Sequence, residues 1–395
     1  MLYPLSLKIA LLELHVFALI ETTDKLREFC QTIEKYEWFA LDTEFLREKT
    51  YYSKLCLVQI QADDLRACID PIKIKDLNPL YDVLKNPDIT KVLHAAHQDL
   101  EIFKQLMGEV PTPVFDTQIA AAVLGLGDHM GYARLVEQML NVTLAKTQTR
   151  TDWSKRPLND AQLNYAIDDV RYLAQMYPMM LEQLNSKNRL HWLDKDFERT
   201  TDPQTYAINT RERWKKVRGN QVLKRPQLAV LRELAAWREE VAERVNRPRK
   251  WILSDDILLD LARQQPASKA AFSEIRGLNP ERIGKNHERW TKLIKKGQAT
   301  PENEWPELPR SKKPTPSQNT LIDLLMIVLQ IEAKEQGITP AAIATRKQIA
   351  TMIQAGETRL SDDWRGAIVN ALFEEIINGE KIVRVDNRKV VVESP

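Results

Sequence analysis

With 395 residues, 43% of them hydrophobic, the chain is long enough to bury two or three separate cores. Its net charge of +2 conceals an uneven distribution, with an excess of ten positive charges in residues 201–300 and an acidic first half. This asymmetry fits a protein in which one part holds a polyanion and another part processes it, or a solvated basic surface without a partner. The three cysteines are an odd number without CxxC spacing, which argues against a disulfide framework or a zinc site and favours a reducing cytoplasm.

The apolar start of the chain is not expected to cross a membrane. Lys8, Glu13 and His15 interrupt its first 20 residues, and no small-residue cleavage site follows. We interpret the first dozen residues as an extension and the segment HVFALIE, at 15–21, as the first strand.

Residues 14–125 alternate between strand-like and helix-like segments, which predicts a central sheet covered by helices. After the first strand, a helix is expected with apolar residues at Leu26, Phe29, Cys30 and Ile33. The other elements expected in this part are strands at 55–61, 65–71 and 91–95, a helix that contains Asp99, and a helix at 115–127 that glycines end.

The segment EWFALDTEFL, at 37–46, is expected to be a buried central strand. Side chains alternate along a strand, so Asp42 and Glu44 share one face while Phe39 and Leu41 lie on the other. Two neighbouring carboxylates in an apolar strand are costly unless a cation neutralises them, and carboxylate oxygens suit Mg²⁺ and Mn²⁺. A strand end whose acids face water is the alternative.

The segment at 159–184 is expected to be a helix with Asn159 as its N-cap. Tyr165 and Asp169 are four residues apart, so their side chains lie one above the other on one face. A solvent-facing acid beside a surface tyrosine fits the same spacing.

The second half of the chain is predicted to be mostly helical. Residues 187–221 are polar and read as a linker with short helical pieces, and residues 222–300 as a compact helical domain in which Ser254 caps a helix. Residues 301–315 are rich in proline and charge, which indicates an extended linker. Residues 316–395 are expected to form three helices and a closing hairpin that turns at Asp386-Asn387.

Three stretches of the first half form a specific pattern: FALDTEFLREKTYYSKLCLVQI, KVLHAAHQDLEIF and RTDWSKRPLNDAQLNYAIDDVRYL. They resemble the three exonuclease motifs of the DEDD superfamily, and the YxxxD spacing resembles its tyrosine-bearing branch. Over this region the chain is similar to bacterial members of the ribonuclease D family. Residues 222–300 resemble the HRDC domain, and residues 316–395 resemble the second, more divergent HRDC-like domain of that family.

The resemblance implies an α/β fold in which a ribonuclease H-like exonuclease domain, at 14–186, has a mixed central sheet with flanking helices. Two small all-helical HRDC-type domains would follow it, the last ending in a β-hairpin. The implied activity is 3′→5′ exoribonuclease hydrolysis that releases nucleoside 5′-monophosphates in tRNA 3′-end maturation. The expected partners are RNA, in particular tRNA precursors with 3′ extensions, with no membrane and no obligate protein partner, in the cytoplasm.

The same resemblance assigns two divalent metal ions, Mg²⁺ or Mn²⁺, to four acids. Asp42 would bridge both ions, Glu44 and Asp169 would complete the site of the ion that activates water, and Asp99 would hold the ion beside the leaving oxygen. Tyr165 would orient the attacking water, because a phenol with an ordinary pKa of about 10 is a poor general base at neutral pH.

Four further residues are candidates for contacts with RNA. Thr43 and Phe45 could touch the terminal nucleotide, Gln118 could do so through its amide, and Arg156 could bind a phosphate. Core packing for Phe45 and helix-end hydrogen bonding for Gln118 are left open.

Basic segments with aromatic or apolar anchors are expected to bind RNA phosphates without reading the bases. One group is Arg150 and Lys155 around Trp153, although Trp153 could equally belong to the core. The other group lies in the helical domain and consists of RERWKKVR (211–218), RPRKW (247–251) and KLIKK (292–296). Binding of another protein by this domain is the alternative.

Two other functions remain compatible with the sequence. One is a 3′→5′ exonuclease that acts on DNA, because the acids do not distinguish the sugars and a contact with the 2′-OH would. The other is a non-catalytic RNA-binding scaffold with a vestigial site, against which the presence of all four acids and Tyr165 counts.

Overall fold

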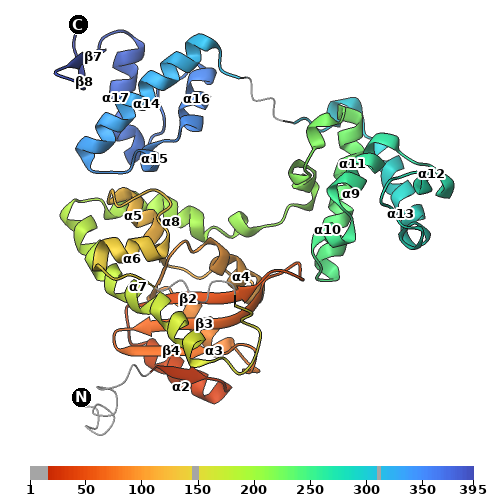
Figure 1. The fold of residues 1–395 in the computed structure, drawn as a ribbon, viewed down its shortest axis with the longest axis horizontal. Coiled ribbons are helices and arrows are strands. Elements are labelled where there is room, and N and C mark those ends of the chain that lie inside the picture. The colour runs from red at the N-terminus through yellow and green to blue at the C-terminus, as the bar shows by residue number, and fades with distance from the viewer. Residues whose placement is uncertain (1–16, 145–150, 309–312) are drawn as a thin grey trace. The chain divides into compact units, whose positions relative to one another are not determined.

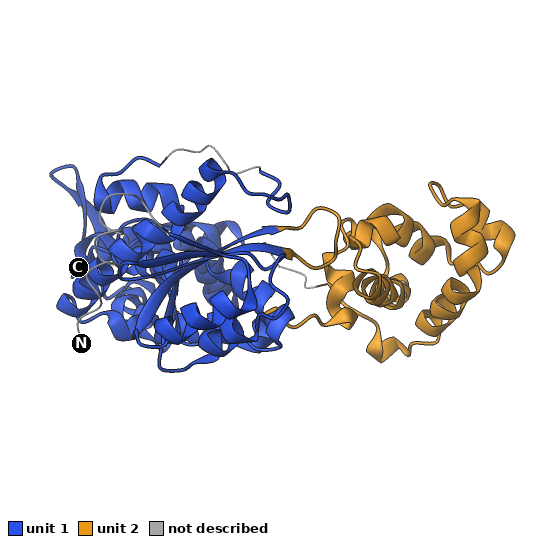
Figure 2. Ribbon diagram, turned by 90° about the horizontal axis from the view of Figure 1, so that it is seen from below, with its two compact units in different colours: residues 1–45, 55–205, 312–395 blue, residues 46–54, 206–311 orange. Residues whose placement is uncertain are grey.

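The computed structural model describes residues 17–144, 151–308 and 313–395, so our interpretations of the first dozen residues and of Arg150 lie outside the described residues. The chain divides into two compact units (Figure 2). One comprises residues 1–45, 55–205 and 312–395, and the other comprises residues 46–54 and 206–311. Within the described ranges, every helix is too short or too polar to span a lipid bilayer.

A six-stranded mixed sheet forms the centre of the first unit (Figure 1). Its spatial order is β1-β4-β3-β2-β5-β6, in which β3 is antiparallel to β4, while β1 is parallel to β4 and β5 is parallel to both β2 and β6. The strands are β1 (Ala18–Ile20), β2 (Trp38–Leu46), β3 (Lys54–Ala62), β4 (Leu65–Ile69), β5 (Thr90–Leu93) and β6 (Val114–Asp116). The acid-bearing strand β2 is therefore an interior strand, as predicted.

The helices of this unit bury the apolar positions that the sequence indicated. In α2 (Thr23–Ile33) all four predicted apolar residues are buried. The long helix α7 (Asp160–Ser186) packs on β4 and β5, and Asn159 caps it by a capping box with Gln162, which confirms the predicted N-cap. The remaining helices of this sheet domain are α3 (Asn78–Lys85), α4 (His97–Met107), α5 (Thr117–Val123) and α6 (Tyr132–Leu140).

The prediction of one helix over residues 115–127 was wrong at its start. Phe115 and Asp116 belong to β6, paired with Val92 and Leu93 of β5, and the helix begins only at Thr117. The side chain of Asp116 accepts a hydrogen bond from the backbone N–H of Gln118, so it acts as the N-cap and sets this boundary. A strand of three residues is too short for its period to stand out in the sequence.

The second unit is helical. Its helices are α9 (Arg225–Arg244), α10 (Arg249–Ile252), α11 (Asp255–Gln264), α12 (Lys269–Ser273) and α13 (Pro280–Gln298), with short 3₁₀ turns η3 (Thr210–Lys216), η4 (Asn220–Val222) and η5 (Glu302–Glu304). Ser254 caps α11, as predicted. Trp214, from the stretch expected to be a linker, is buried in the core of this unit with Trp237 and Trp290.

The loop between β2 and β3 packs within this second unit. The hydroxyl of Tyr51 donates to the buried carboxylate of Glu239 on α9 at 2.6 Å. The backbone N–H groups of Tyr51 and Tyr52 both donate to the side-chain oxygen of Asn246, at 3.0 and 3.1 Å. The loop thus takes its polar partners from the helical unit, although the sequence places it inside the exonuclease motif.

The chain from 313 to its end forms helices around an apolar core of its own. They are α14 (Pro316–Gln336), α15 (Pro340–Ile343), α16 (Arg346–Ala355) and α17 (Trp364–Ile377). The first unit also contains η1 (Leu190–Leu193) and α8 (Asp194–Thr201), and η2 (Pro203–Tyr206) lies where the chain passes into the second unit. The predicted hairpin is present as β7 (Ile382–Asp386) and β8 (Lys389–Glu393). Asn387 and Arg388, both with positive φ, form its turn, one residue later than predicted.

Candidate active site

Three carboxylates converge between the interior strand and the long helix. Asp42 and Glu44 come from the same face of β2, and Asp169 comes from α7, which packs across the sheet. Each offers a carboxylate oxygen, and these oxygens all lie within 4.8 Å of one another. Asp42 and Glu44 of the first motif therefore lie on the face of β2 that meets Asp169 of the third motif, as the predicted alternation of the strand allows.

The fourth acid, Asp99, lies in the first turn of α4 and is buried. The hydroxyl of Thr43, between the two acids of β2, donates a hydrogen bond to the carboxylate of Asp99. Asp99 also contributes to raising the pKa of Asp42 and Glu44, which puts it within electrostatic reach of the cluster. The structure thus brings all four predicted acids into one site.

Burial raises the pKa of all four carboxyls, and neighbouring negative charges add to it, that of Asp116 in the case of Asp99. Burial is the larger cause for Asp42, followed by the charges of Asp169 and Asp99. Burial and then the charges of Asp42 and Asp99 raise the pKa of Glu44 to about 9, and burial raises the pKa of Asp99 to about 6. For Asp169 the pKa is also well above the ordinary range, through burial and then the charge of Glu44. The deprotonated cluster is therefore unfavourable by itself, and a hard divalent cation fits it through oxygen donors alone.

Tyr165 lies one turn before Asp169 on α7. Its pKa is raised by burial first and then by the charges of Asp169, Glu44 and Asp42, so the phenol keeps its proton. Because it stays protonated, it can donate a hydrogen bond and is a poor base, in line with the role predicted for it. The ring of Trp153 lies 6.1 Å from that of Tyr165, and Trp153 is buried, so it belongs to the core.

The predicted substrate contacts fall into different surroundings. Thr43 is buried, and its hydroxyl is directed to Asp99. Gln118, in the first turn of α5, donates its side-chain amide to the carbonyl of Met130 at 3.0 Å, while Phe45 is partly buried on β2. Contacts of Thr43, Phe45 and Gln118 with RNA remain predictions.

Arg156 is held by protein partners. Its guanidinium pairs with the buried carboxylate of Asp70 at 2.5 and 2.8 Å, and donates to the carbonyls of Cys56, Trp153 and Lys155 at 2.6 to 2.8 Å. All three nitrogens of the guanidinium therefore donate hydrogen bonds within the protein. We therefore leave Arg156 out of the RNA contacts that we propose below.

Tyr132, which our reading of the sequence missed, lies close to Asp169 and Asp42. Its hydroxyl donates to the backbone carbonyl of Asp168 at 2.9 Å, and its ring makes an edge contact with His94. Burial, followed by the charges of Asp169 and Asp42, raises its pKa well above the ordinary range. A tyrosine in the short segment GYARL carries no spacing signal that could have identified it.

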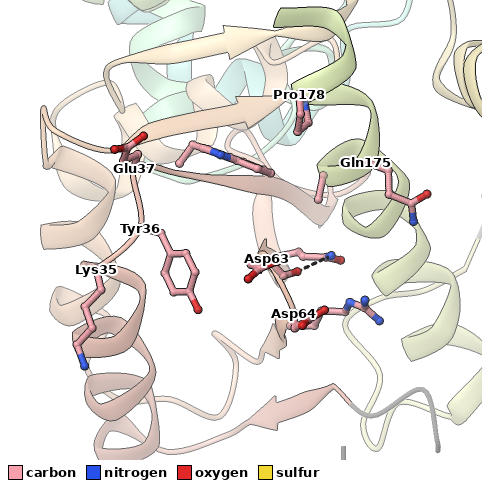
Figure 3. A pocket seen from close by; sticks show the side chains of 11 residues that line it. Lys35, Tyr36, Glu37, Asp63, Asp64, Gln175 and Pro178 are labelled. Carbon is pink, nitrogen blue, oxygen red and sulfur yellow. Dashed lines mark hydrogen bonds between the residues drawn. The ribbon is translucent and has the colours of Figure 1, made fainter. Parts of the chain in front are cut away.

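A separate hollow of about 620 Å³ opens at the start of β2 (Figure 3). Its lining includes Trp38, with Gln175 and Pro178 from α7, and the amide of Gln61 donates to the carbonyl of Asp63 at 2.9 Å. The convergent carboxylates begin four residues further along β2. The cluster of acids therefore provides the candidate metal site.

Comparison with known proteins assigns the fold and the family. Residues 17–185 match a family model described as a 3′-5′ exonuclease, and residues 227–294 match the HRDC domain. Ribonuclease D of Bartonella henselae is 36% identical over 383 residues, which cover 94% of this chain and 93% of that protein. The chain belongs to the ribonuclease D family. It is thus a 3′→5′ exoribonuclease with an α/β exonuclease domain, a helical region that includes an HRDC domain, and a terminal two-stranded sheet.

Further relatives support this assignment along the whole chain. Ribonuclease D of Zymomonas mobilis is 37% identical and covers 96% of this chain and 98% of its own. A solved structure of Escherichia coli RNase D, described as an exoribonuclease involved in structured RNA processing, matches with a TM-score of 0.80 at 29% identity. The match covers 92% of this chain and 99% of that one.

The substitution Thr43→Val is expected to lower kcat by roughly 10- to 100-fold, the usual range for a residue that supports a metal ligand. Valine keeps the shape of threonine but cannot donate to the carboxylate of Asp99. Single-turnover hydrolysis of a labelled RNA measures the effect, and Thr32→Val on the exposed face of α2 is the control. Wild-type kcat in Thr43→Val would mean that this hydrogen bond does not support the reaction.

Divalent metal is expected to stabilise the protein more at pH 8.5 than at pH 6. Acids whose folded pKa is raised favour folding below their ordinary pKa and lose this contribution as the pH rises through the folded value, about 6 for Asp99 and about 9 for Glu44. A cation binds the deprotonated cluster and competes with protons, so its effect grows over the same range. Melting temperatures with Mn²⁺ and with EDTA, measured at both pH values, test this; an equal shift at both would contradict it.

Proposed function

We propose that the protein removes nucleotides from the 3′ end of RNA by a two-metal mechanism and releases nucleoside 5′-monophosphates. The observation that carries the proposal is the convergence of Asp42, Glu44 and Asp169 within 4.8 Å, with Asp99 close by. An all-oxygen set of carboxylates suits Mg²⁺ or Mn²⁺. Membership of the ribonuclease D family supports RNA as the substrate.

The four acids and Tyr165 would have different roles in the reaction. As the family resemblance implies, Asp42 would hold both ions, whereas Glu44 and Asp169 would complete one site and Asp99 the other. The oxygens of Asp42, Glu44 and Asp169 lie within 4.8 Å of one another, which supports a shared site for these three acids. When bound, such ions lower the pKa of the attacking water and neutralise the charge that develops on the leaving oxygen. The protonated phenol of Tyr165 would orient that water by a hydrogen bond.

We infer that the substrates include tRNA precursors with 3′ extensions, and that the terminal nucleotide contacts Phe45, which follows Glu44, and Gln118. The E. coli relative, described as acting in structured RNA processing, supports this substrate class. The reducing cytoplasm is the proposed compartment, and it fits three cysteines that are all buried in the fold.

The helical unit would add affinity for RNA, chiefly through the segment RPRKW. Trp251 is half exposed and Lys250 is exposed, so they offer a stacking surface beside a charge. All three basic segments contain cations that are paired within the unit: Arg249 with Glu239 at 3.1 Å, Arg213 with Glu239 at 3.0 Å and Lys296 with Glu233 at 2.8 Å. The exposed ring of Trp251 is what favours RPRKW among them.

The test uses a single-stranded RNA labelled at its 5′ end and a DNA of the same sequence. Each is incubated with Mn²⁺, with Mg²⁺ and with EDTA, beside an Asp169→Ala variant as the control. The proposal expects a ladder that shortens the RNA from its 3′ end and disappears with EDTA and with the variant. Equal or faster loss of DNA would favour the DNA exonuclease, and binding without shortening would favour the scaffold.

A further inference from the structure

Asp116 occupies the junction of β6 and α5 and is buried, with 4% of its surface exposed. In the sheet it lies opposite Leu93, the last residue of β5. Its Oδ1 accepts hydrogen bonds from the backbone N–H groups of Gln118 at 2.8 Å and of Ala95 at 3.0 Å, and its Oδ2 accepts one from Ala96 at 2.9 Å. One carboxylate therefore caps the helix that follows it and also binds the turn after the neighbouring strand.

The turn that Asp116 binds connects β5 to α4. Ala95 has a φ of +57°, a left-handed conformation that is unfavourable for a residue with a Cβ atom. Ala96 is the N-cap of α4, and its methyl group cannot accept a hydrogen bond from the free N–H groups of the first turn. The carboxylate of Asp116 fixes the two alanines from the adjacent strand, and its negative charge lies at the favourable end of the helix dipole.

Asp99 follows Ala96 by three residues, in the first turn of the same helix. The direction in which that turn begins determines where the carboxylate of Asp99 lies. The carboxylate of Asp99 also accepts a hydrogen bond from the hydroxyl of Thr43 on β2. Asp99 is thus held between a contact to the acid-bearing strand and a helix start that Asp116 secures.

We propose that Asp116 is a positioning residue for the metal site, which directs the carboxylate of Asp99 toward the other acids by fixing the start of α4. The inference rests on the proposed function of the four acids and adds a residue to the machinery that supports them. Asp116 acts through the backbone, because its two oxygens accept three N–H groups and it lies outside the group of acids whose oxygens converge. Asp116 would orient a metal ligand without binding the metal itself. Mutation of such a residue commonly lowers metal affinity by about 10- to 100-fold.

The test compares Asp116→Ala and Asp116→Asn with the matched control Asn279→Ala. Asn279 is the N-cap of α13 in the helical unit and accepts a hydrogen bond from the backbone N–H of Arg282 at 2.8 Å, so its loss removes a helix cap from the unit that does not contain the four acids. Mn²⁺ binding is measured by electron paramagnetic resonance of the free ion, which needs no turnover. We expect affinity to fall by about 10-fold or more in Asp116→Ala and by less in Asp116→Asn, which keeps one acceptor oxygen, with no change in the control.

Kinetics provide a second readout that a merely structural role would not move. At subsaturating Mn²⁺, kcat is expected to fall in both Asp116 variants and to recover as Mn²⁺ is raised. The KM for RNA is expected to stay within about twofold of the wild-type value, because Asp116 supports a metal ligand and not an RNA contact.

Wild-type Mn²⁺ affinity in a folded Asp116→Ala protein would overturn the inference. If Asp116→Ala does not fold, as judged by circular dichroism, the result for Asp116→Asn is used instead. Wild-type Mn²⁺ affinity and kcat in Asp116→Asn would equally overturn the inference. A wild-type protein that binds no Mn²⁺ or leaves RNA intact would instead count against the proposed function itself.

Discussion

Replacing Asp42 with asparagine is expected to lower kcat by about 10⁴-fold and, in EDTA, to raise the melting temperature. Asp42 is the acid that the family resemblance assigns to both ions, and the charges of Asp99 and Asp169 both raise its pKa, so its loss is expected to affect both ions. Losing several kcal/mol of transition-state stabilisation by the ions corresponds to roughly four orders of magnitude in rate. The melting temperature is expected to rise because the amide replaces a half-buried carboxyl whose pKa is held well above its ordinary range by desolvation and by like charges.

The gain in stability is expected to increase between pH 6 and pH 9. A carboxyl with a raised folded pKa favours folding only while it is protonated, so both proteins lose stability as the pH rises, and the amide variant loses less because it lacks the carboxyl of Asp42. Single-turnover kinetics and thermal unfolding in EDTA measure the two effects, with Asp24→Asn on the exposed start of α2 as the control. Activity within tenfold of wild type, or a lower melting temperature without metal, would contradict this account.

Replacing Arg156 with glutamine is expected to destabilise the protein by about 3–5 kcal/mol, the usual effect of leaving a buried ion without its partner. The change leaves the carboxylate of Asp70 buried and unpaired, and removes donors from the carbonyls of Cys56 and Trp153. Urea unfolding followed by circular dichroism measures the loss. At a temperature where the variant is folded, the KM for RNA is expected to stay within about twofold of wild type.

The neighbouring substitution Lys155→Gln is the matched control, because Lys155 is exposed and a change at an exposed position costs at most about 0.5 kcal/mol. Unchanged stability together with a raised KM in Arg156→Gln would return Arg156 to the phosphate contact that the sequence alone predicted. Reduced stability without a change in KM would establish its role as a buried ion-pair partner of Asp70.

The parts of the site that the sequence predicts are those in which local periodicity determines direction. Alternation along β2 puts Asp42 and Glu44 on one face, and helical spacing puts Tyr165 one turn before Asp169, so these relations follow from the chain itself. The capping residue Asn159 marked the start of α7 for the same reason. Bringing these elements together required the resemblance to the DEDD motifs, since no local rule relates a strand near residue 42 to a helix near residue 169.

What the sequence did not reveal depends on partners far along the chain. Lys91 reads as a surface residue of a short strand, yet it is fully buried and donates to the carbonyls of Asn86, Ile89 and Thr112 at 2.7 to 2.8 Å. Trp214 lies in a polar stretch that resembles a linker and is buried only because α9 covers it. Asp116 reads as part of a helix until its pairing with Leu93 of β5 is known.

An anomalous-scattering map from crystals of the wild-type protein grown with Mn²⁺ and a phosphorothioate oligoribonucleotide would show directly whether the four acids bind metal. We expect one manganese peak at Asp42, Glu44 and Asp169, a second at Asp42 and Asp99, and the 3′-terminal phosphate between them. Crystals that bind the oligonucleotide but contain no manganese at these acids would contradict a metal-dependent site built from them.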